Sequence, residues 1–237
     1  MTNFEFAIKC KELATNYKTL YVLGGFGAPL NASNKQRAIA QYAYNAKRKA
    51  MINAATADTF AFDCCGVIKG LCWDFDGNVN AVYGGAKYAS NGIPDIGADA
   101  MISYCGNVSK DFSHIEIGEA VWKSGHIGVY IGNGLAVECS PAWQNKVQIT
   151  ACNCTKKGYH TRTWTKHGKL PWILYLPEGD ISADGKVTSE DARLALRAAV
   201  KLENLTKAQT LAGDLDHDGK ITSADARAIL NKSVNKD

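Results

Sequence analysis

The stretch that decides the fold is FDCCGVIKGLCW, residues 62–73. Asp63 is a good N-cap, and beyond it apolar side chains recur at helical spacing, at Val67, Ile68, Leu71 and Cys72. The stretch therefore predicts a helix that begins after Asp63 and buries one face. A thiol in the first turn lies at the positive end of the helix dipole beside unpaired N–H groups, and both favour the nucleophilic thiolate. Cys64 and Cys65 share this turn, and these arguments do not separate them.

A second motif is GHIGVYIGNGLAVEC, residues 125–139. Its alternation of apolar and polar residues around an Asn-Gly pair predicts a β-hairpin. His126 stands at the start of the first strand, where its imidazole can take a proton from a cysteine on a packed helix. Glu138 on the second strand can orient that ring. A buried structural thiol is the alternative for a cysteine considered alone, and this second motif favours a catalytic role.

The register of the hairpin decides whether Glu138 can reach His126. A two-residue turn pairs Val129 with Glu138 and places the glutamate on the opposite face from the histidine. A three-residue loop over 132–134 pairs Gly128 with Glu138 and places both side chains on one face, because side chains alternate along a strand. We predict the second register.

The remaining body supplies helices first and strands afterwards. Thr2 and Glu5 form a possible capping box for a helix at the start of the chain, and Ser33 with Gln36 repeats the pattern for a helix over 33–55. Strand character follows over 119–122, 126–131, 135–139, 147–151 and 172–176. This order predicts an α+β fold with helices packed on an antiparallel sheet.

The C-terminal part contains a repeat. GDISADGKVTSEDAR, residues 179–193, recurs 34 positions later as GDLDHDGKITSADAR, residues 213–227. Each copy places oxygen-bearing side chains around a glycine at the spacing with which a short loop wraps calcium, an ion that takes six to eight oxygen ligands. The predicted ligands of two calcium ions are Asp180, Ser182, Asp184, Thr188, Asp191, Asp214, Asp216, Asp218, Thr222 and Asp225, with backbone carbonyls from Lys186 and Lys220.

Two features distinguish these loops from a typical EF-hand. The last ligand is Asp where an EF-hand has Glu, and no full helix precedes the first loop. Both features resemble the dockerin type I module over about residues 179–235. The resemblance implies a small all-α domain of paired EF-hand-like loops at 179–237, and a cohesin domain as partner. It places partner contacts at Ser189-Glu190 and Ser223-Ala224, and the difference between these pairs argues against a symmetric dual binding mode.

The motifs of the body resemble those of the NlpC-type and CHAP cysteine hydrolases of bacterial cell walls. Asp63-Cys64 followed by Gly66, and then GHIGVYIG at 125–132, stand in the order and spacing of that family. The resemblance implies a papain-like domain over residues 1–176. It aligns Cys64 with the nucleophile, whereas Cys65 takes a place that the family fills with Ser or Ala.

The same resemblance implies an activity and its residues. Cys64, His126 and Glu138 become the candidate catalytic residues of a peptidoglycan hydrolase that cleaves a stem-peptide amide, as an endopeptidase or an N-acetylmuramoyl-L-alanine amidase. YVLGG at 21–25 resembles a stretch near the family's substrate groove, so Tyr21 and Asp63 become candidate substrate-binding residues. N-capping alone is the alternative role for Asp63. A non-catalytic protein that binds cell wall and docks to cohesin, and a thiol acyltransferase on the same fold, are the alternative functions.

The composition of the chain limits its expected partners and location. The 237 residues carry a net charge of +4, and residues 179–237 hold 9 Lys/Arg against 10 Asp/Glu. The rest of the chain is therefore mildly basic, which weakly suits an anionic polymer, and we expect no nucleic-acid partner. The lack of a long apolar run predicts no membrane insertion. Glu5 interrupts the place of a signal peptide's apolar stretch. We therefore expect a cytoplasmic protein released at lysis, as a phage or prophage endolysin, or a secreted one if the sequence is trimmed.

The eight cysteines and the remaining histidines give no further site at this level. No cysteine spacing makes a pair of zinc knuckles, so most of the thiols are expected to be buried. His114, His160 and His167 lack a paired motif and are expected on the surface or in loops.

Overall fold

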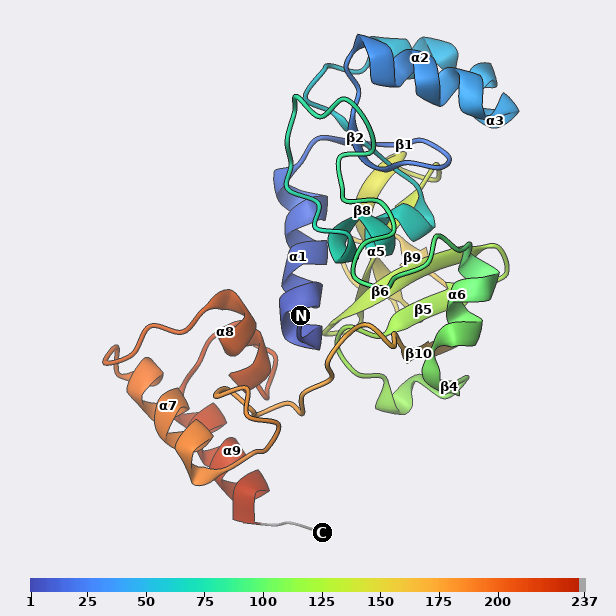
Figure 1. Cartoon of the computed structure of the whole chain (residues 1–237). Helices are drawn as coiled ribbons and strands as arrows, with labels where there is room; N and C mark the ends of the chain where they lie inside the picture. The colour runs from blue at the N-terminus through green and yellow to red at the C-terminus, as the bar shows by residue number, and fades with distance from the viewer. Residues whose placement is uncertain (235–237) are drawn as a thin grey trace. The chain divides into compact units, whose positions relative to one another are not determined.

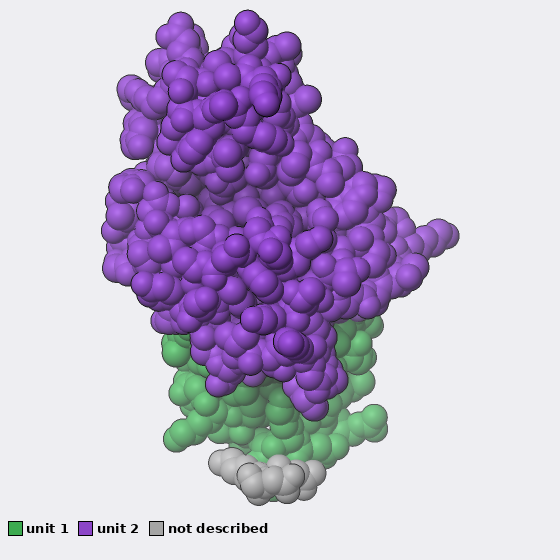
Figure 2. Space-filling model, turned by 90° about the vertical axis from the view of Figure 1, so that its right-hand side faces the viewer, with its two compact units in different colours: residues 1–8, 173–237 green, residues 9–172 purple. Residues whose placement is uncertain are grey.

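The computed structural model describes residues 1–234, and the last three residues of the predicted C-terminal domain lie outside the described part. The chain forms two compact units, residues 9–172 and residues 1–8 with 173–237, which Figure 2 shows in two colours. The first residues count with the C-terminal unit because the Asn3 amide N–H donates to the Leu174 carbonyl at 2.9 Å and the Asn3 side chain accepts from Leu176 N–H at 3.1 Å.

The first helix, α1 (Asn3–Asn16), begins with the predicted capping box. The Glu5 carboxylate accepts from the Thr2 amide at 2.8 Å, and the Thr2 hydroxyl accepts from the Glu5 amide at 3.2 Å. Cys10 and Leu13, which follow the helical period along α1, are buried.

The single helix predicted over 33–55 is wrong. The segment forms three short helices, α2 (Ala32–Gln41), α3 (Ala43–Lys47) and α4 (Lys49–Ala54). The N-cap is Asn31 rather than Ser33, since the Asn31 side chain accepts from the Asn34 amide. The backbone is extended at Tyr42, and the buried Asn45 amide group then donates to the carbonyl of Leu23, outside the helices. The same amide group also donates to the Ala38 carbonyl of α2, so Asn45 joins the short helices to the turn that follows Tyr21.

Two sheets organise the first unit, and the predicted α+β class is confirmed (Figure 1). The smaller sheet has the order β1 (Thr19–Tyr21), β3 (Phe60–Phe62) and β2 (Phe26–Pro29). The larger sheet has the order β4 (Gly106–Ser109), β10 (Lys166–Lys169), β5 (Ala120–Lys123), β6 (His126–Gly132), β7 (Leu135–Ser140), β8 (Lys146–Cys152) and β9 (Thr161–Arg162). Its pairs are antiparallel except for β8 with β9. Helix α5 (Cys64–Cys72) packs on β6 and β7, and α6 (Ala98–Tyr104) packs on β5.

The strand predicted over 172–176 is wrong. The chain turns at Pro171, which has no N–H to donate to a strand ladder. The preceding segment β10 pairs with β4 and β5 instead. Its sequence, KHGK, shows no strand pattern, so its place in the sheet was not expected.

The C-terminal unit is helical beyond its first loop, as predicted. It contains α7 (Ser189–Ala199), α8 (Lys207–Gly213) and α9 (Ser223–Val234). Ile181, Ala192, Ala195, Ala226 and Ile229 form its buried core. Within residues 1–234, none of the helices combines the length and the apolar character needed to cross a bilayer.

Candidate active site and calcium loops

Helix α5 starts where the sequence predicts, and Asp63 holds that start in place. The Asp63 carboxylate accepts from the Gly66 amide at 2.6 Å and from the Gly24 amide at 2.7 Å. The Asp63 amide donates to the Gly25 carbonyl at 2.9 Å. Asp63 therefore caps the helix and joins it to the turn that follows Tyr21, in addition to any role in binding substrate.

Gly66 is required by this close approach. A Cβ atom at position 66 would lie 1.8 Å from the Gly25 carbonyl oxygen, well inside the distance that real Cβ atoms show. The glycine lets the first turn of α5 sit directly against the Gly24–Gly25 turn, and this contact positions the two cysteines.

A cleft of about 540 Å³ opens over the start of α5. Three of the residues predicted for the site, Tyr21, Asp63 and Cys64, border it, and so does Cys65. The other polar groups around it are Gln41, Tyr42, Lys69, Tyr83, Tyr88, Asp95 and Asp99. Substrate can thus reach the first turn of α5 from solvent.

Electrostatics separate the two cysteines. Their Sγ atoms lie 3.8 Å apart, and the exposed fractions of the residues are 9% for Cys64 and 6% for Cys65. Hydrogen bonding from the Cys65 thiol lowers the pKa of Cys64 to about 4; burial opposes this shift, and hydrogen bonding to His126 reinforces it. The pKa of Cys65 is raised by the same hydrogen bond and by burial. The arrangement favours Cys64 as the thiolate.

The predicted hairpin register is confirmed. Gly128 pairs with Glu138, so His126 and Glu138 lie on one face, and the His126 Nε2 and Glu138 Oε2 atoms are 2.7 Å apart. The imidazole also stacks on Trp164, with ring centroids 5.4 Å apart and planes 8° apart. Burial lowers the pKa of His126, but hydrogen bonding to Cys64 and Glu138 outweighs burial and raises it. The ring is held in one orientation with its imidazolium form favoured.

Glu138 is fully buried and has two partners that the sequence did not reveal. Arg162 donates to it from Nη2 at 2.8 Å and from Nε at 3.0 Å, and the Thr150 hydroxyl donates at 2.9 Å. Burial raises the pKa of Glu138, whereas hydrogen bonding to His126 and Arg162 lowers it below its ordinary value. Arg162 lies on the two-residue strand β9, where no sequence pattern marks it.

Tyr21 ends strand β1 and pairs with Phe62, the residue before Asp63. Burial, followed by the charges of Cys64 and Asp63, raises the pKa of the Tyr21 hydroxyl. The hydroxyl therefore stays protonated at neutral pH and remains a hydrogen-bond donor at the edge of the cleft.

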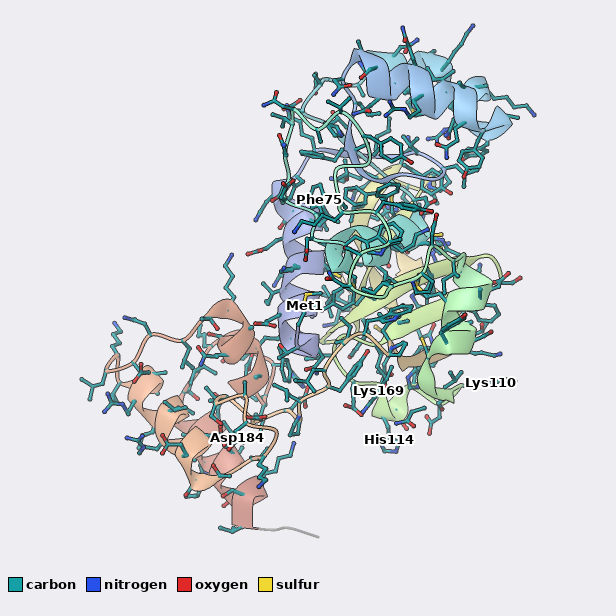
Figure 3. All side chains as sticks on the ribbon, viewed as in Figure 1. Met1, Phe75, Lys110, His114, Lys169 and Asp184 are labelled. Carbon is teal, nitrogen blue, oxygen red and sulfur yellow. The ribbon has the colours of Figure 1, made fainter. Side chains whose placement is uncertain are left out.

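The other histidines differ in their exposure to solvent. His114 lies exposed on the short helix η1 (Phe112–His114), at the outer edge of its unit in Figure 3, and His160 is exposed, as predicted. The surface prediction for His167 is wrong. His167 is buried, its Nδ1 meets the Glu119 carboxylate, and its Nε2 donates to the Asp111 carbonyl at 2.8 Å. This pairing holds β10 to β5 and gives the ring a structural role.

The two C-terminal loops fold in the same way. Asp180 accepts from the amides of Asp184 and Gly185, and Asp214 accepts from those of Asp218 and Gly219. Gly185 and Gly219 have φ angles of 88° and 89°, in the region that favours glycine. The repeated sequence therefore makes the same turn twice.

The last carboxylate of each loop closes it. Asp191 accepts from the amides of Ser182 and Thr188, and Asp225 accepts from those of Leu215 and Thr222. These bonds join the start of each loop to the helix that follows it.

The ligand set fits a hard cation. Carboxylate oxygens of Asp214, Asp216 and Asp218 all lie within 4.8 Å of one another. Asp216 and Asp218 are exposed, and so is Asp184 of the first loop, which Figure 3 labels. Burial, with the charges of Asp225 and Asp218, raises the pKa of Asp214. A divalent cation among these oxygens relieves that repulsion, which supports the calcium assignment for the second loop.

Comparison with known families confirms the C-terminal resemblance. Residues 178–235 match the family described as the dockerin type I domain. Dockerin type I domains bind calcium and cohesin domains. No curated protein sequence matches the chain.

Two solved structures are similar to the chain at low identity. NlpC2 from Trichomonas vaginalis is 15% identical, with 71% of this chain and 46% of that chain covered and a TM-score of 0.39. The P60 domain of an antigen from M. avium subspecies paratuberculosis is 16% identical, with 70% and 93% covered and a TM-score of 0.37. The chain thus spans less than half of the NlpC2 structure, and we take no activity from either alignment.

The expected cytoplasmic location is wrong. Dockerin domains function in extracellular assemblies of the cellulosome type, and the match over 178–235 therefore implies secretion. The endolysin role rested on the same expectation, and neither the fold nor the family match supports it specifically.

Proposed function

We propose that the protein is a cysteine-dependent peptidoglycan hydrolase that cleaves an amide bond of the stem peptide. One observation carries the proposal: Cys64, with a lowered pKa, opens to a cleft at the N-terminus of α5, beside a histidine that Glu138 orients. A nucleophile, a base and a group that orients the base are the parts that acyl transfer requires. The choice of peptidoglycan as substrate rests on the motif resemblance of residues 62–73 and 125–132.

In the first step, the Cys64 thiolate attacks the amide carbonyl and forms a tetrahedral intermediate. The Cys64 backbone N–H belongs to the first helical turn, whose N–H groups have no partner within the helix, and it stabilises the oxyanion. The Tyr21 hydroxyl at the cleft edge can hydrogen-bond the substrate. The His126 imidazolium then donates its proton to the leaving amine as the C–N bond breaks, leaving a thioester on Cys64.

In the second step, neutral His126 takes a proton from water, and the resulting hydroxide attacks the thioester. The C–S bond breaks, the carboxylic acid leaves and the Cys64 thiolate returns. Glu138 accepts from His126 Nε2 throughout, so the other ring nitrogen faces Cys64. Because the cleft is open, water reaches the thioester, and this favours hydrolysis over transfer to another acceptor.

The test is to incubate the protein and its Cys64→Ala variant with Gram-positive sacculi and identify released fragments by mass spectrometry. Release that depends on Cys64 supports the proposal, and the fragment masses distinguish an endopeptidase from an amidase. Release by both proteins contradicts the assignment of Cys64. Binding to sacculi without release supports the alternative of a non-catalytic cell-wall-binding protein.

We further propose that the C-terminal loops bind two calcium ions, with domains at residues 1–176 and 179–237. Calcium then raises the melting temperature of the full chain, because the ion binds only the folded loops. Asp218→Ala should reduce that rise, whereas Asp76→Ala, on an exposed turn outside the repeat, should leave it unchanged. An identical melt in calcium and in chelator contradicts the assignment.

A cohesin domain is the proposed partner of this region. The two proposed contact pairs open helices α7 and α9, and they differ in environment. Glu190 is paired with Arg193, whose Nε lies 3.0 Å from it, whereas Ala224 stands at the matching place of the second copy. Binding to a type I cohesin that requires calcium and that changes with Glu190→Ala supports this partner, and calcium-independent binding contradicts it.

A further inference from the structure

The turn that leads into His126 lacks the usual geometry of a tight hairpin. Lys123 pairs with His126, so only Ser124 and Gly125 join β5 to β6. Two-residue hairpin turns normally have a positive φ at their first central residue, because this matches the twist of the two strands. Here the second residue, Gly125, has a φ of 70°, whereas the φ of Ser124 is not positive. Contacts from outside the turn therefore help to fix its position.

Asp99, in the first turn of α6, makes such a contact. Its Oδ1 atom accepts from the Gly125 amide and from the Trp122 indole Nε1–H, both at 2.9 Å. Trp122 lies on β5 and Gly125 directly precedes His126, so one oxygen atom holds both sides of the turn. Hydrogen bonds to an ionised carboxylate are roughly twice as strong as those between neutral groups. Because α6 also packs on β5 and β6, Asp99 fixes the turn to a neighbouring rigid element.

The Asp99 side chain serves these two donors alone. Within the described part of the chain it takes part in no ion pair and accepts no further hydrogen bond. Asp99 and Gly125 both border the cleft that contains Cys64. The pKa of His126 is set mainly by burial, Cys64 and Glu138. Asp99 therefore acts on the histidine through its hydrogen bonds to the turn rather than through its charge.

The position of His126 matters because its ring reaches two partners at once. Its Nε2 lies 2.7 Å from the Glu138 carboxylate, and the ring also hydrogen-bonds Cys64. A shift of the turn moves the start of β6 and weakens the contact with Cys64. We propose that Asp99 is a positioning residue of the active site, which fixes the turn before His126 and thereby sets the contact between His126 and Cys64. The positioning stands on the hydrogen bonds, whereas its effect on turnover rests on the proposed function.

Alkylation of Cys64 by iodoacetamide tests the positioning without any turnover. Its rate is measured across pH on the full chain, because the thiolate is the form that reacts, and mass spectrometry separates adducts of Cys64 from those of Cys65. In Asp99→Ala the midpoint of Cys64 alkylation should move to higher pH, because a displaced His126 stabilises the thiolate less. Asp99→Asn should match the wild type, because one carboxamide oxygen can accept both N–H groups.

The remaining titratable groups around the Cys64 thiol are the same in every variant. They are Asp63, Cys65, Tyr21 and Cys139. Asp111→Ala is the matched control, because Asp111 also accepts a backbone amide, that of Ser113 at 2.9 Å, but lies outside the cleft. It should leave the midpoint of Cys64 alkylation unchanged.

Two outcomes overturn the positioning role. One is an unmoved midpoint in Asp99→Ala, and the other is an equal shift in Asp99→Asn, which would assign the effect to charge. If Asp99→Ala does not fold, Trp122→Phe decides in its place, because it removes one of the two donors and keeps an aromatic ring. Its midpoint should also move to higher pH, and an unmoved midpoint then overturns the role.

Turnover of a soluble stem peptide separates positioning from substrate binding. Asp99→Ala should lower kcat by roughly 10–100-fold with little change in KM, because the misplaced group acts in the chemical step. Asp99→Asn should restore kcat. A rise in KM with an unchanged kcat contradicts the proposal, since it would make Asp99 a substrate-binding residue. A shifted alkylation midpoint in Asp99→Ala, with no hydrolysis by the wild type, leaves the positioning of His126 standing and refutes the proposed function instead.

Discussion

Replacing Arg162 with Met should damage both stability and catalysis, because Arg162 neutralises the fully buried Glu138. The guanidinium makes contacts of 2.8 and 3.0 Å with this carboxylate, and the Arg162 side chain is only 16% exposed. Removing one partner of a buried ion pair costs about 3–5 kcal/mol. Glu138 keeps His126 and Thr150, so we expect the lower end, about 3 kcal/mol, which corresponds to a melting temperature lower by roughly 6–12 °C.

The pH dependence of this loss has a definite sign. The pKa of Glu138 lies below its ordinary value, so the stability from its ionised form is present at neutral pH and is lost as pH falls through the folded pKa. The difference in melting temperature between wild type and Arg162→Met should therefore shrink in acid. Without the guanidinium, the full charge of Glu138 acts on His126 and raises its pKa. The alkaline limb of the kcat/KM profile should then move to higher pH.

Calorimetry across pH and hydrolysis rates across pH check both effects. Arg193→Met is the matched control, because Arg193 makes an exposed ion pair, which contributes little to stability. Arg162→Lys should recover part of the stability but not the two-point contact. Stability and pH profile equal to the wild type in Arg162→Met would refute the role of Arg162. A lower melting temperature with an unchanged pH profile of kcat/KM would show that Arg162 contributes to stability but does not affect His126.

Three further substitutions probe the same site. Glu138→Gln removes the charge that raises the pKa of His126, so the alkaline limb of the kcat/KM profile should move to lower pH. The value of kcat/KM should also fall at least ~10-fold. An alkaline limb that does not move would exclude Glu138 as the group that orients His126. Gly66→Ala should lower the free energy of unfolding in denaturant by about 3 kcal/mol or more, because its Cβ meets the Gly25 carbonyl. Gly106→Ala is the control, and its free energy of unfolding should hardly change, because open space surrounds that position. Asp63→Ala should cost roughly 1–2 kcal/mol from the lost cap, and a variant as stable as the wild type would contradict the capping role.

The parts of the site that the sequence could predict depend on local rules. The start of α5 follows from Asp63 as N-cap and from the apolar period beyond it. The meeting of His126 and Glu138 follows from the length of one turn and the alternation of side chains along two adjacent strands. The calcium loops follow from a ligand pattern that occurs twice within 34 residues. In each case the interacting residues lie close together in the chain.

The parts that escaped prediction depend on partners far apart in the sequence. Arg162 reaches Glu138 across 24 residues through a strand of two residues, and His167 is buried by Glu119 across 48 residues. Asn45, which follows the break in the helix predicted over 33–55, donates to Leu23 across 22 residues. Hydropathy and propensity carry no information about such pairs, because they arise only when the sheet has formed.

The most direct test of the central claim is to identify the residue that carries the acyl group during turnover. The protein is quenched in acid while it hydrolyses stem peptide, digested with protease, and analysed by mass spectrometry with fragmentation that distinguishes Cys64 from Cys65. The account predicts the mass of the acyl fragment on Cys64, and none on Cys65 or in the Cys64→Ala variant. An acyl group on Cys65, or hydrolysis that continues in Cys64→Ala, would contradict it.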